Sequence, residues 1–184
     1  MRKNFGPKPM LYPMPVLIIG TYGEDGTPNA MNAAWGGIAD TELISICLGD
    51  HKTTRNIFAR KAFTVSMADA QNAVAADYVG IVSGDKVLDK LEKAGWHTRK
   101  SEFVDAPLIE ELPKALECTF VSYDDETGLL LGRIVNVCAE ERILTEGKID
   151  LQKFHPITYD PSGHGYYTLG QRVGDAFSMG KQLK

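Results

Sequence analysis

Short runs of apolar and β-branched residues recur along the chain and predict a mainly β protein. Val16–Thr21 is such a run, and it leads to a tight turn at Glu24-Asp25-Gly26. The pattern therefore predicts an antiparallel hairpin, with a second strand over Asn29–Trp35 that breaks at Gly36-Gly37. Further strands are expected over Leu43–Gly49, Phe63–Met67, Ala115–Tyr123 and Leu129–Ala139, with Arg142–Leu144 as a candidate extension of the last one.

Three shorter stretches have helical character: Thr53–Lys61, Gln71–Val79 and Val87–Ala94, which ends at Gly95. Beyond Gly147 the chain is rich in proline and glycine, and we expect loops there. The predicted fold is α+β, mainly β: an antiparallel barrel of about six strands with short helices between them. A doubly wound sheet is disfavoured because helices do not alternate regularly with strands. We expect a single domain over residues 1–184.

Composition narrows the class of protein. Of the 184 residues, 43% are hydrophobic and 24% are charged, which is typical of a globular domain. The formal net charge of -4 argues against general binding to nucleic acid, and the longest apolar run, Val16–Gly20, is too short to span a membrane. The N-terminus is a poor signal peptide. The three cysteines are odd in number and widely spaced, and we interpret them as buried strand thiols of a cytoplasmic protein: Cys47, Cys118 and Cys138.

The stretch GDHKTTRNI, Gly49–Ile57, concentrates positive charge at the start of a predicted helix. The first amides of a helix lack internal partners and carry partial positive charge, so a phosphate bound there gains several donors. Lys52, Arg55 and the hydroxyl of Thr53 would add to them. Taken alone, the stretch favours an ordinary helix start with solvated charges and an Asp50 cap.

The preceding strand, NAMNAAWGG, is unusual for a core strand. Asn32, Ala33 and Ala34 are small or amide-bearing where Val or Ile would be expected. Small residues let a flat ring approach the backbone, and amides can pair with a polar ring edge. Trp35 either covers such a ring or fills the core, and for a lone tryptophan we favour the core. Strand and helix start together predict a mononucleotide pocket.

Four motifs in order resemble those of the flavin reductase-like, FMN-binding split-barrel proteins, and most of all the flavoredoxin-like branch. They are PVLIIGTYGEDGTPNAMNAAWGG, GDHKTTRNI, DYVGIVSG and HGYYTLGQRVGDAF. The resemblance spans nearly the whole chain. It implies a six-stranded antiparallel Greek-key split β-barrel with peripheral helices. It also implies a homodimer, with FMN bound near the dimer interface.

The resemblance also implies roles for individual residues. The Asn29–Trp35 strand would lie along the flavin ring, the segment after Asp50 would hold the phosphate and ribityl chain, and later segments would close the pocket. The implied cofactor-binding residues are Asn29, Met31, Asn32, Ala33, Ala34, Trp35, His51, Lys52, Thr53, Arg55, Asn56, Ser83, Lys90 and Tyr167. Tyr78, Gly84 and Tyr166 are further lining candidates. We assign no catalytic residue and no metal site.

Some of these residues have alternative interpretations. Lys90 equally fits an exposed lysine on a plain amphipathic helix, and Tyr78 fits core packing. His164 lies in a glycine-rich loop, where it is either merely exposed or a proton donor near a reduced flavin.

Three functions are compatible with the sequence. The first is an FMN-dependent oxidoreductase that takes hydride from NADH or NADPH and passes electrons to free flavin, ferric complexes or another acceptor. The second is a flavoredoxin-type electron-transfer protein reduced by a protein partner. It stays open because NAMNAAWGG differs from the corresponding strand of two-component flavin reductases. The third is a non-redox binding module on the same barrel that carries haem or another flat ligand; for haem, His51 is the candidate axial ligand by position.

Overall fold

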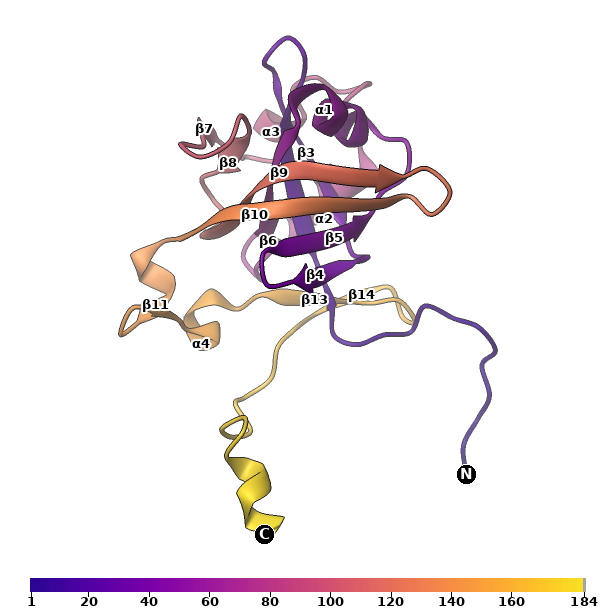
Figure 1. Cartoon of the computed structure of the whole chain (residues 1–184), viewed down its shortest axis with the longest axis vertical. Coiled ribbons are helices and arrows are strands. Elements are labelled where there is room, and N and C mark those ends of the chain that lie inside the picture. The colour runs from indigo at the N-terminus through magenta and orange to yellow at the C-terminus, as the bar shows by residue number, and fades with distance from the viewer. Residues whose placement is uncertain (184) are drawn as a thin grey trace.

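The computed structural model describes residues 1–183, and its centre is a curled antiparallel sheet of seven strands (Figure 1). The strand order is β3-β2-β6-β9-β10-β5-β4. The bounds of these strands are β2 Leu17–Tyr22, β3 Pro28–Ala33, β4 Gly36–Asp40, β5 Leu43–Cys47, β6 Ala62–Met67, β9 Lys114–Asp124 and β10 Leu129–Ala139. The predicted fold class, a mainly β antiparallel split barrel with peripheral helices, is confirmed.

The barrel is split between β3 and β4, which are the two edge strands of the sheet and are consecutive in sequence. Only Ala34 and Trp35 separate them, so the chain passes directly from one edge to the other. The backbone N–H of Cys47 donates to the carbonyl of Trp35 at 2.7 Å and fixes this connection. The opening of the barrel therefore lies beside the short segment Asn32–Trp35.

The remaining elements surround the main sheet. Four α-helices are short: α1 Lys52–Arg60, α2 Ala73–Ile81, α3 Lys90–Lys93 and α4 Leu151–Phe154. A three-stranded sheet has the order β1-β13-β14, with bounds β1 Met14–Pro15, β13 Ile157–Asp160 and β14 Gly165–Thr168. Two small hairpins and two 3-10 helices complete the fold: β7 Thr98–Lys100 with β8 Pro107–Ile109, β11 Leu144–Thr145 with β12 Lys148–Ile149, η1 Glu141–Ile143 and η2 Met179–Leu183.

Strand β2 is buried on both faces and so connects two hydrophobic clusters. Because side chains alternate along a strand, Leu17 and Ile19 pack inside the barrel with Ile57 and Phe63. Ile18 and Val16 face the other way, against a cluster that includes residues of α2 and α3. This double burial explains the unbroken apolar run at the start of the chain.

The structure differs from the sequence prediction at the two glycines after Trp35. They do not end the sheet but begin β4. A Cβ atom on Gly36 would lie 2.8 Å from Leu17 Cδ1 and 2.9 Å from the carbonyl oxygen of Ser45. The glycine thus permits a close backbone approach at the edge of the barrel, a use of glycine that resembles a strand break in the sequence.

Other expected boundaries were also wrong. The helix expected over Val87–Ala94 is reduced to α3, because residues 83–89 form turns. Arg142 lies in the 3-10 helix η1 rather than in an extension of β10. The region beyond Gly147 is not only loop, since it contains β12, α4, β13 and β14.

The cysteines are free thiols, and only Cys118 is fully buried. Burial raises the pKa of this thiol to about 12. Cys47 and Cys138 are half-buried, so the expectation of burial was wrong for them. Within residues 1–183, no helix is both long and apolar enough to cross a membrane.

Candidate functional site

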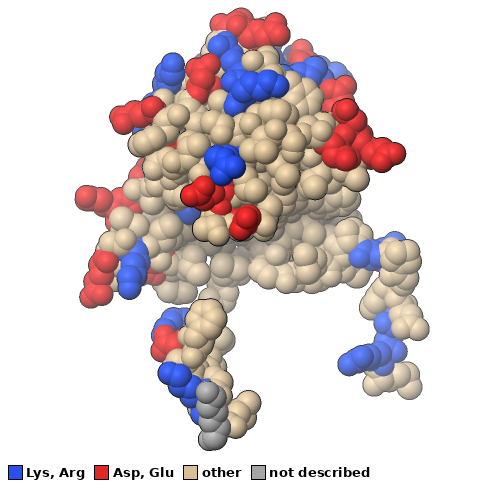
Figure 2. Space-filling model, viewed as in Figure 1, with Lys and Arg blue, Asp and Glu red and all other residues tan. Residues whose placement is uncertain are grey.

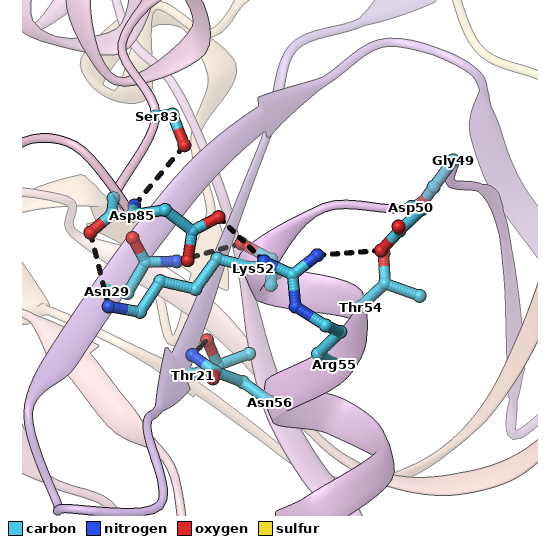
Figure 3. Close-up of polar contacts among 12 residues, drawn as sticks. Thr21, Asn29, Gly49, Asp50, Lys52, Thr54, Arg55, Asn56, Ser83 and Asp85 are labelled. Atoms are coloured by element: carbon cyan, nitrogen blue, oxygen red, sulfur yellow. Dashed lines mark hydrogen bonds and ion pairs between the residues drawn. The ribbon is translucent and has the colours of Figure 1, made fainter.

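The start of α1, the edge strand β3 and the segment after α2 enclose a cavity of about 300 Å³, which we call the lysine cavity. Helix α1 begins after His51, whose side chain makes no capping hydrogen bond. Instead Thr54 Oγ1 donates to the carbonyl of Gly49 at 2.7 Å (Figure 3). Asp50 is not the cap that the alternative interpretation proposed. The cavity is lined by Asn29, Met31, Asn32, Asp50, His51, Lys52, Thr53, Val79, Gly80, Ile81, Val82, Ser83, Gly84, Asp85 and Lys90.

Two ammonium groups converge on this cavity from different elements. Lys52 Nζ donates to the carbonyl of Gly84 at 3.2 Å. Lys90 Nζ donates to the carbonyls of Val79 and Val82, at 3.1 and 2.9 Å. Lys90 is only 4% exposed, so the interpretation as an exposed surface lysine was wrong. Within residues 1–183, neither lysine forms an ion pair with a carboxylate.

Burial lowers the pKa of Lys90 to about 8; the nearby charge of Lys52 acts in the same direction, and that of Asp85 acts in the opposite direction. A buried ammonium group whose hydrogen-bond partners are carbonyl groups lowers the stability of the folded protein, because its charge is removed from water. An anion bound between the two lysines would offset this cost. The cavity is therefore suited to a phosphate or carboxylate group.

Asn29 supplies an unpaired acceptor beside the lysines. Its Nδ2 donates to Thr53 Oγ1 at 2.8 Å, but its buried Oδ1 has no hydrogen-bond partner among residues 1–183. A Cβ atom at position 84 would lie 2.3 Å from this oxygen, so glycine is needed there for Asn29 to pack this closely against the segment after α2. Buried polar atoms in proteins are almost always paired. Asn29 Oδ1 thus fits a ligand that brings a hydrogen-bond donor into the cavity.

Arg55 is not itself a lining residue of the lysine cavity, and its guanidinium lies between two carboxylates that are (Figure 3). Its guanidinium is 2.7 Å from Asp50 and 2.6 Å from Asp85. These contacts connect the segment before α1 to the segment after α2, which are two walls of the lysine cavity. Arg55 therefore holds the cavity walls together in this structure. Asn56 is also structural here, since it is buried and donates to Thr21 Oγ1 at 3.0 Å.

A second cavity of about 370 Å³ continues from the first and shares Asn32, Gly80 and Ile81 with it. We call it the tyrosine cavity. Its other lining residues are Val16, Ala33, Ala34, Asp77, Tyr159, His164 and Tyr166. We refer to these two neighbouring cavities along β3 as the groove, with cations at one end and small and aromatic residues at the other.

Two hydrogen-bonded pairs line the tyrosine cavity. Tyr159 Oη and His164 Nδ1 are 2.8 Å apart, and Tyr166 Oη donates to Asp77 Oδ1 at 2.9 Å. Burial, with Asp77 as its hydrogen-bond partner, raises the pKa of Tyr166 to about 12. Tyr166 is therefore a neutral hydroxyl donor at physiological pH, and it fixes the β13–β14 hairpin to α2.

Comparison with known proteins identifies the family. A model described as the flavin reductase like domain matches residues 10–165. The chain belongs to this family.

Two solved structures of flavoredoxins are similar to this flavin reductase-like protein over its full length. The flavoredoxin of Desulfovibrio vulgaris (Miyazaki F) is 35% identical and superposes with a TM-score of 0.94, covering 98% of this chain and 100% of that one. The flavoredoxin from Methanosarcina acetivorans is 26% identical, with a TM-score of 0.90 and full coverage of both chains. A relative from Aquifex aeolicus (strain VF5), described as an uncharacterized protein, is 24% identical over 162 residues, 80% of this chain and 81% of its own.

Most of the residues that the sequence indicated lie in this groove of the flavin reductase-like fold. The lysine cavity is lined by Asn29, Met31, Asn32, His51, Lys52, Thr53, Ser83 and Lys90, and the tyrosine cavity by Asn32, Ala33 and Ala34. Arg55, Asn56, Trp35 and Tyr167 are not among the lining residues of either cavity. Trp35 is 56% exposed, so our preference for a core tryptophan was wrong. It lies in the connection between the edge strands, where its side chain is exposed and does not pack in the core.

Sequence reasoning missed Asp77 and Tyr159, and it proposed Tyr167 as a binding residue while leaving Tyr166 as a secondary candidate. Neighbouring residues on a strand point to opposite faces. On β14 Tyr166 lines the tyrosine cavity, whereas Tyr167 is largely exposed. An earlier recognition of β14 as a strand would have shown that only one of the two tyrosines can face the cavity.

The residues present fit a flavin with an anionic tail. Among residues 1–183, the two lysines of the lysine cavity form no ion pair, and Asn29 Oδ1 is a buried acceptor without a hydrogen-bond partner. The tyrosine cavity offers small residues on β3 against which a flat ring can lie. The groove thus has different chemistry at its two ends, as a flavin nucleotide does.

The burial of Lys90 predicts a pH dependence of stability in the cofactor-free protein. Because its pKa is about 8 in the folded protein and about 10.5 when unfolded, the unfolded chain binds more protons between these values. The free energy of unfolding should therefore rise with pH across this range, by about 1–3 kcal/mol relative to Lys90→Met. Urea denaturation at a series of pH values measures the difference. Lys86→Met, which removes an exposed lysine, should follow the wild type. Parallel profiles for wild type and Lys90→Met would refute the assignment.

Proposed function

We propose that the groove binds FMN and that the protein is an FMN-dependent oxidoreductase that accepts electrons from NADH or NADPH. The observation that carries this proposal is the buried Lys90 ammonium, which has no ion-pair partner among residues 1–183 and faces a cavity that Lys52 also lines. A phosphate group is the tail that distinguishes FMN from riboflavin. Its charge would offset the desolvation of Lys90.

Each part of the groove would hold a different part of FMN. Lys52 and Lys90 would neutralise the phosphate, with His51, Thr53 and Ser83 as further hydrogen-bonding groups. Asn29 Oδ1 would accept a hydrogen bond from a ribityl hydroxyl, and Met31 and Asn32 line the next part of the wall. Ala33 and Ala34 would lie against the flat ring. Arg55 and Asn56 would act indirectly, by fixing the walls through Asp50, Asp85 and Thr21.

When bound, FMN would supply the redox chemistry, because it accepts and releases hydride equivalents. The protein's own contribution is to bind, orient and shield. Gly80 and Gly84 let the walls of the groove pack closely, since a Cβ at these positions would lie 3.0 Å from Asn32 Cβ and 2.3 Å from Asn29 Oδ1. His164, paired with Tyr159 at the rim, is placed to move a proton between solvent and a ligand in the tyrosine cavity.

A second candidate function is that of a flavoredoxin-type electron carrier reduced by a protein partner. The similarity to the Desulfovibrio flavoredoxin favours it, because this neighbour is 35% identical over nearly the whole chain. Both functions need the same FMN site, and they differ in the source of electrons.

An anaerobic titration of the FMN-loaded protein with NADPH, and separately with NADH, tests the proposed function. We expect the flavin absorbance near 450 nm to bleach on addition of one of the two. The absorbance spectrum before addition shows whether FMN is retained, and a final addition of dithionite shows that the flavin is reducible. A band that persists with both nucleotides and falls only with dithionite would contradict the reductase proposal and favour the electron carrier.

We also propose that the protein is a homodimer in which the chain ends of one subunit lie on the other. Both ends project from the barrel on the side of β13 and β14 (Figure 1). They expose large apolar side chains, among them Phe5, Val173, Phe177 and Leu183. Such exposure in a water-soluble chain is typical of a surface that another subunit covers.

Charge supports the same arrangement. Lys and Arg are prominent on both projecting ends (Figure 2). Residues 1–13 contain three basic and no acidic residues, whereas residues 14–168 contain 14 basic and 23 acidic residues. A basic, apolar end would therefore be attracted to the acidic body of a second copy.

The double variant Val173→Ser/Phe177→Ser tests this dimer. It should weaken association by about tenfold or more, since two apolar side chains lose their burial. Sedimentation velocity over a range of protein concentrations measures the dissociation constant. Ser178→Ala, an exposed polar position of the same segment, is the matched control. A wild-type protein that sediments as a monomer at every concentration would contradict the proposal.

A further inference from the structure

A third cavity extends the groove beyond the tyrosine cavity. It has a volume of about 510 Å³ and lies between residues 8–15 of the N-terminal arm and the connection from β3 to β4. We call it the arm cavity. Ala34 lines both the tyrosine cavity and the arm cavity, so the two meet at this residue. The lysine, tyrosine and arm cavities thus follow one another along the split of the barrel.

Hydrogen bonds to β13 hold the N-terminal arm, which forms one wall of the arm cavity, in place. Met14 N donates to Thr158 Oγ1 at 2.9 Å, and β1 pairs with β13. Tyr12 Oη donates to Asp160 Oδ1 at 2.8 Å. Three prolines in the lining restrict the backbone further: Pro9, Pro13 and Pro15. The cavity is therefore a built feature of the fold.

The lining chemistry indicates a flat apolar ligand. Trp35 is 56% exposed and forms part of the wall, together with Met10, Leu11 and Met14. A tryptophan provides a large rigid surface for stacking, and methionines adapt to irregular shapes. Lys8 is the only charged residue of the lining. The volume is within the range of small-molecule sites.

We propose that the arm cavity binds the electron acceptor, a flat aromatic compound of the quinone class, with Trp35 as its stacking surface. This inference rests on the proposed function, because the acceptor must lie next to the flavin ring, and the arm cavity meets the tyrosine cavity at Ala34. A nicotinamide dinucleotide carries several phosphate charges, for which this cavity offers only Lys8. A quinone carries no such charge and needs only apolar walls.

The chemistry of the acceptor balances within this arrangement. A quinone becomes a hydroquinone by gaining two electrons and two protons, one proton on each oxygen. The reduced flavin of the proposed function would provide the two electrons, with one proton if they pass as hydride. Solvent would supply the remaining protons, through the open rim where His164 and Tyr159 lie.

NMR of the FMN-loaded protein with 1,4-naphthoquinone as the probe tests the inference. The chain has two tryptophans, Trp35 and Trp96, and the second is 4% exposed in the core. Each gives one indole N–H signal. We expect saturable shifts of the Trp35 signal and an unmoved Trp96 signal.

Trp35→Ala should weaken binding of naphthoquinone by about tenfold, whereas Trp35→Phe should retain most of it because stacking persists. Ile38→Ala, an exposed apolar position on β4 outside the lining, is the control and should bind like the wild type.

Three outcomes would overturn the inference. The Trp35 signal does not shift when naphthoquinone is added, or the Trp35→Ala variant binds naphthoquinone as tightly as the wild type. In the third outcome, the Trp35 signal shifts with protein concentration but not with naphthoquinone. The last would mean that a second copy covers the cavity. The flavin absorbance of the same samples reports FMN retention independently. Loss of FMN would therefore refute the proposed function, whereas retained FMN without naphthoquinone binding would refute only the acceptor site.

Discussion

The burial of one ammonium group, that of Lys90, sets the character of the groove. Its only hydrogen-bond partners among residues 1–183 are carbonyls of Val79 and Val82, near the C-terminal end of α2. The carbonyl end of a helix carries partial negative charge and can accept a cation, but this offsets only part of the desolvation cost. The cofactor-free fold therefore retains an unfavourable electrostatic term, and an anion in the lysine cavity relieves it. The proposed selectivity for a phosphorylated ligand rests on this arrangement.

The split of the barrel determines where such a ligand can extend. Because β3 and β4 are both edge strands, the backbone and small side chains of Asn32–Ala34 are not covered by a neighbouring strand. The groove runs from the two lysines, past these small residues, to the hairpin that carries Tyr159 and Tyr166. The N-terminal arm closes the far end. The cationic end and the apolar end of the site are thus both built on β3 and on its connection to β4.

Much of this arrangement could be predicted from the sequence. The apolar run VLIIG indicated a buried strand at β2, and the stretch GDHKTTRNI predicted the helix start that lines the lysine cavity. The small residues of NAMNAAWGG marked the adjoining strand. Long-range contacts could not be predicted. Lys90 lies in a short amphipathic segment, and its burial and its bonds to the carbonyls of Val79 and Val82 depend on how the chain folds. Arg55 looked like a phosphate ligand, but it is paired with Asp50 and Asp85, and Asp85 is 30 residues away. Trp35 and Gly36 depend on how the two barrel edges meet, which local patterns do not encode.

The most direct test compares the affinities of FMN and riboflavin for the cofactor-free protein, measured by fluorescence titration, because the two differ only in the phosphate. The account predicts that the wild type binds FMN about a hundredfold more tightly than riboflavin, and that Lys90→Met loses about tenfold or more of this preference while its riboflavin affinity is unchanged. Equal affinity of the wild type for the two ligands would contradict the phosphate site, and with it the central claim.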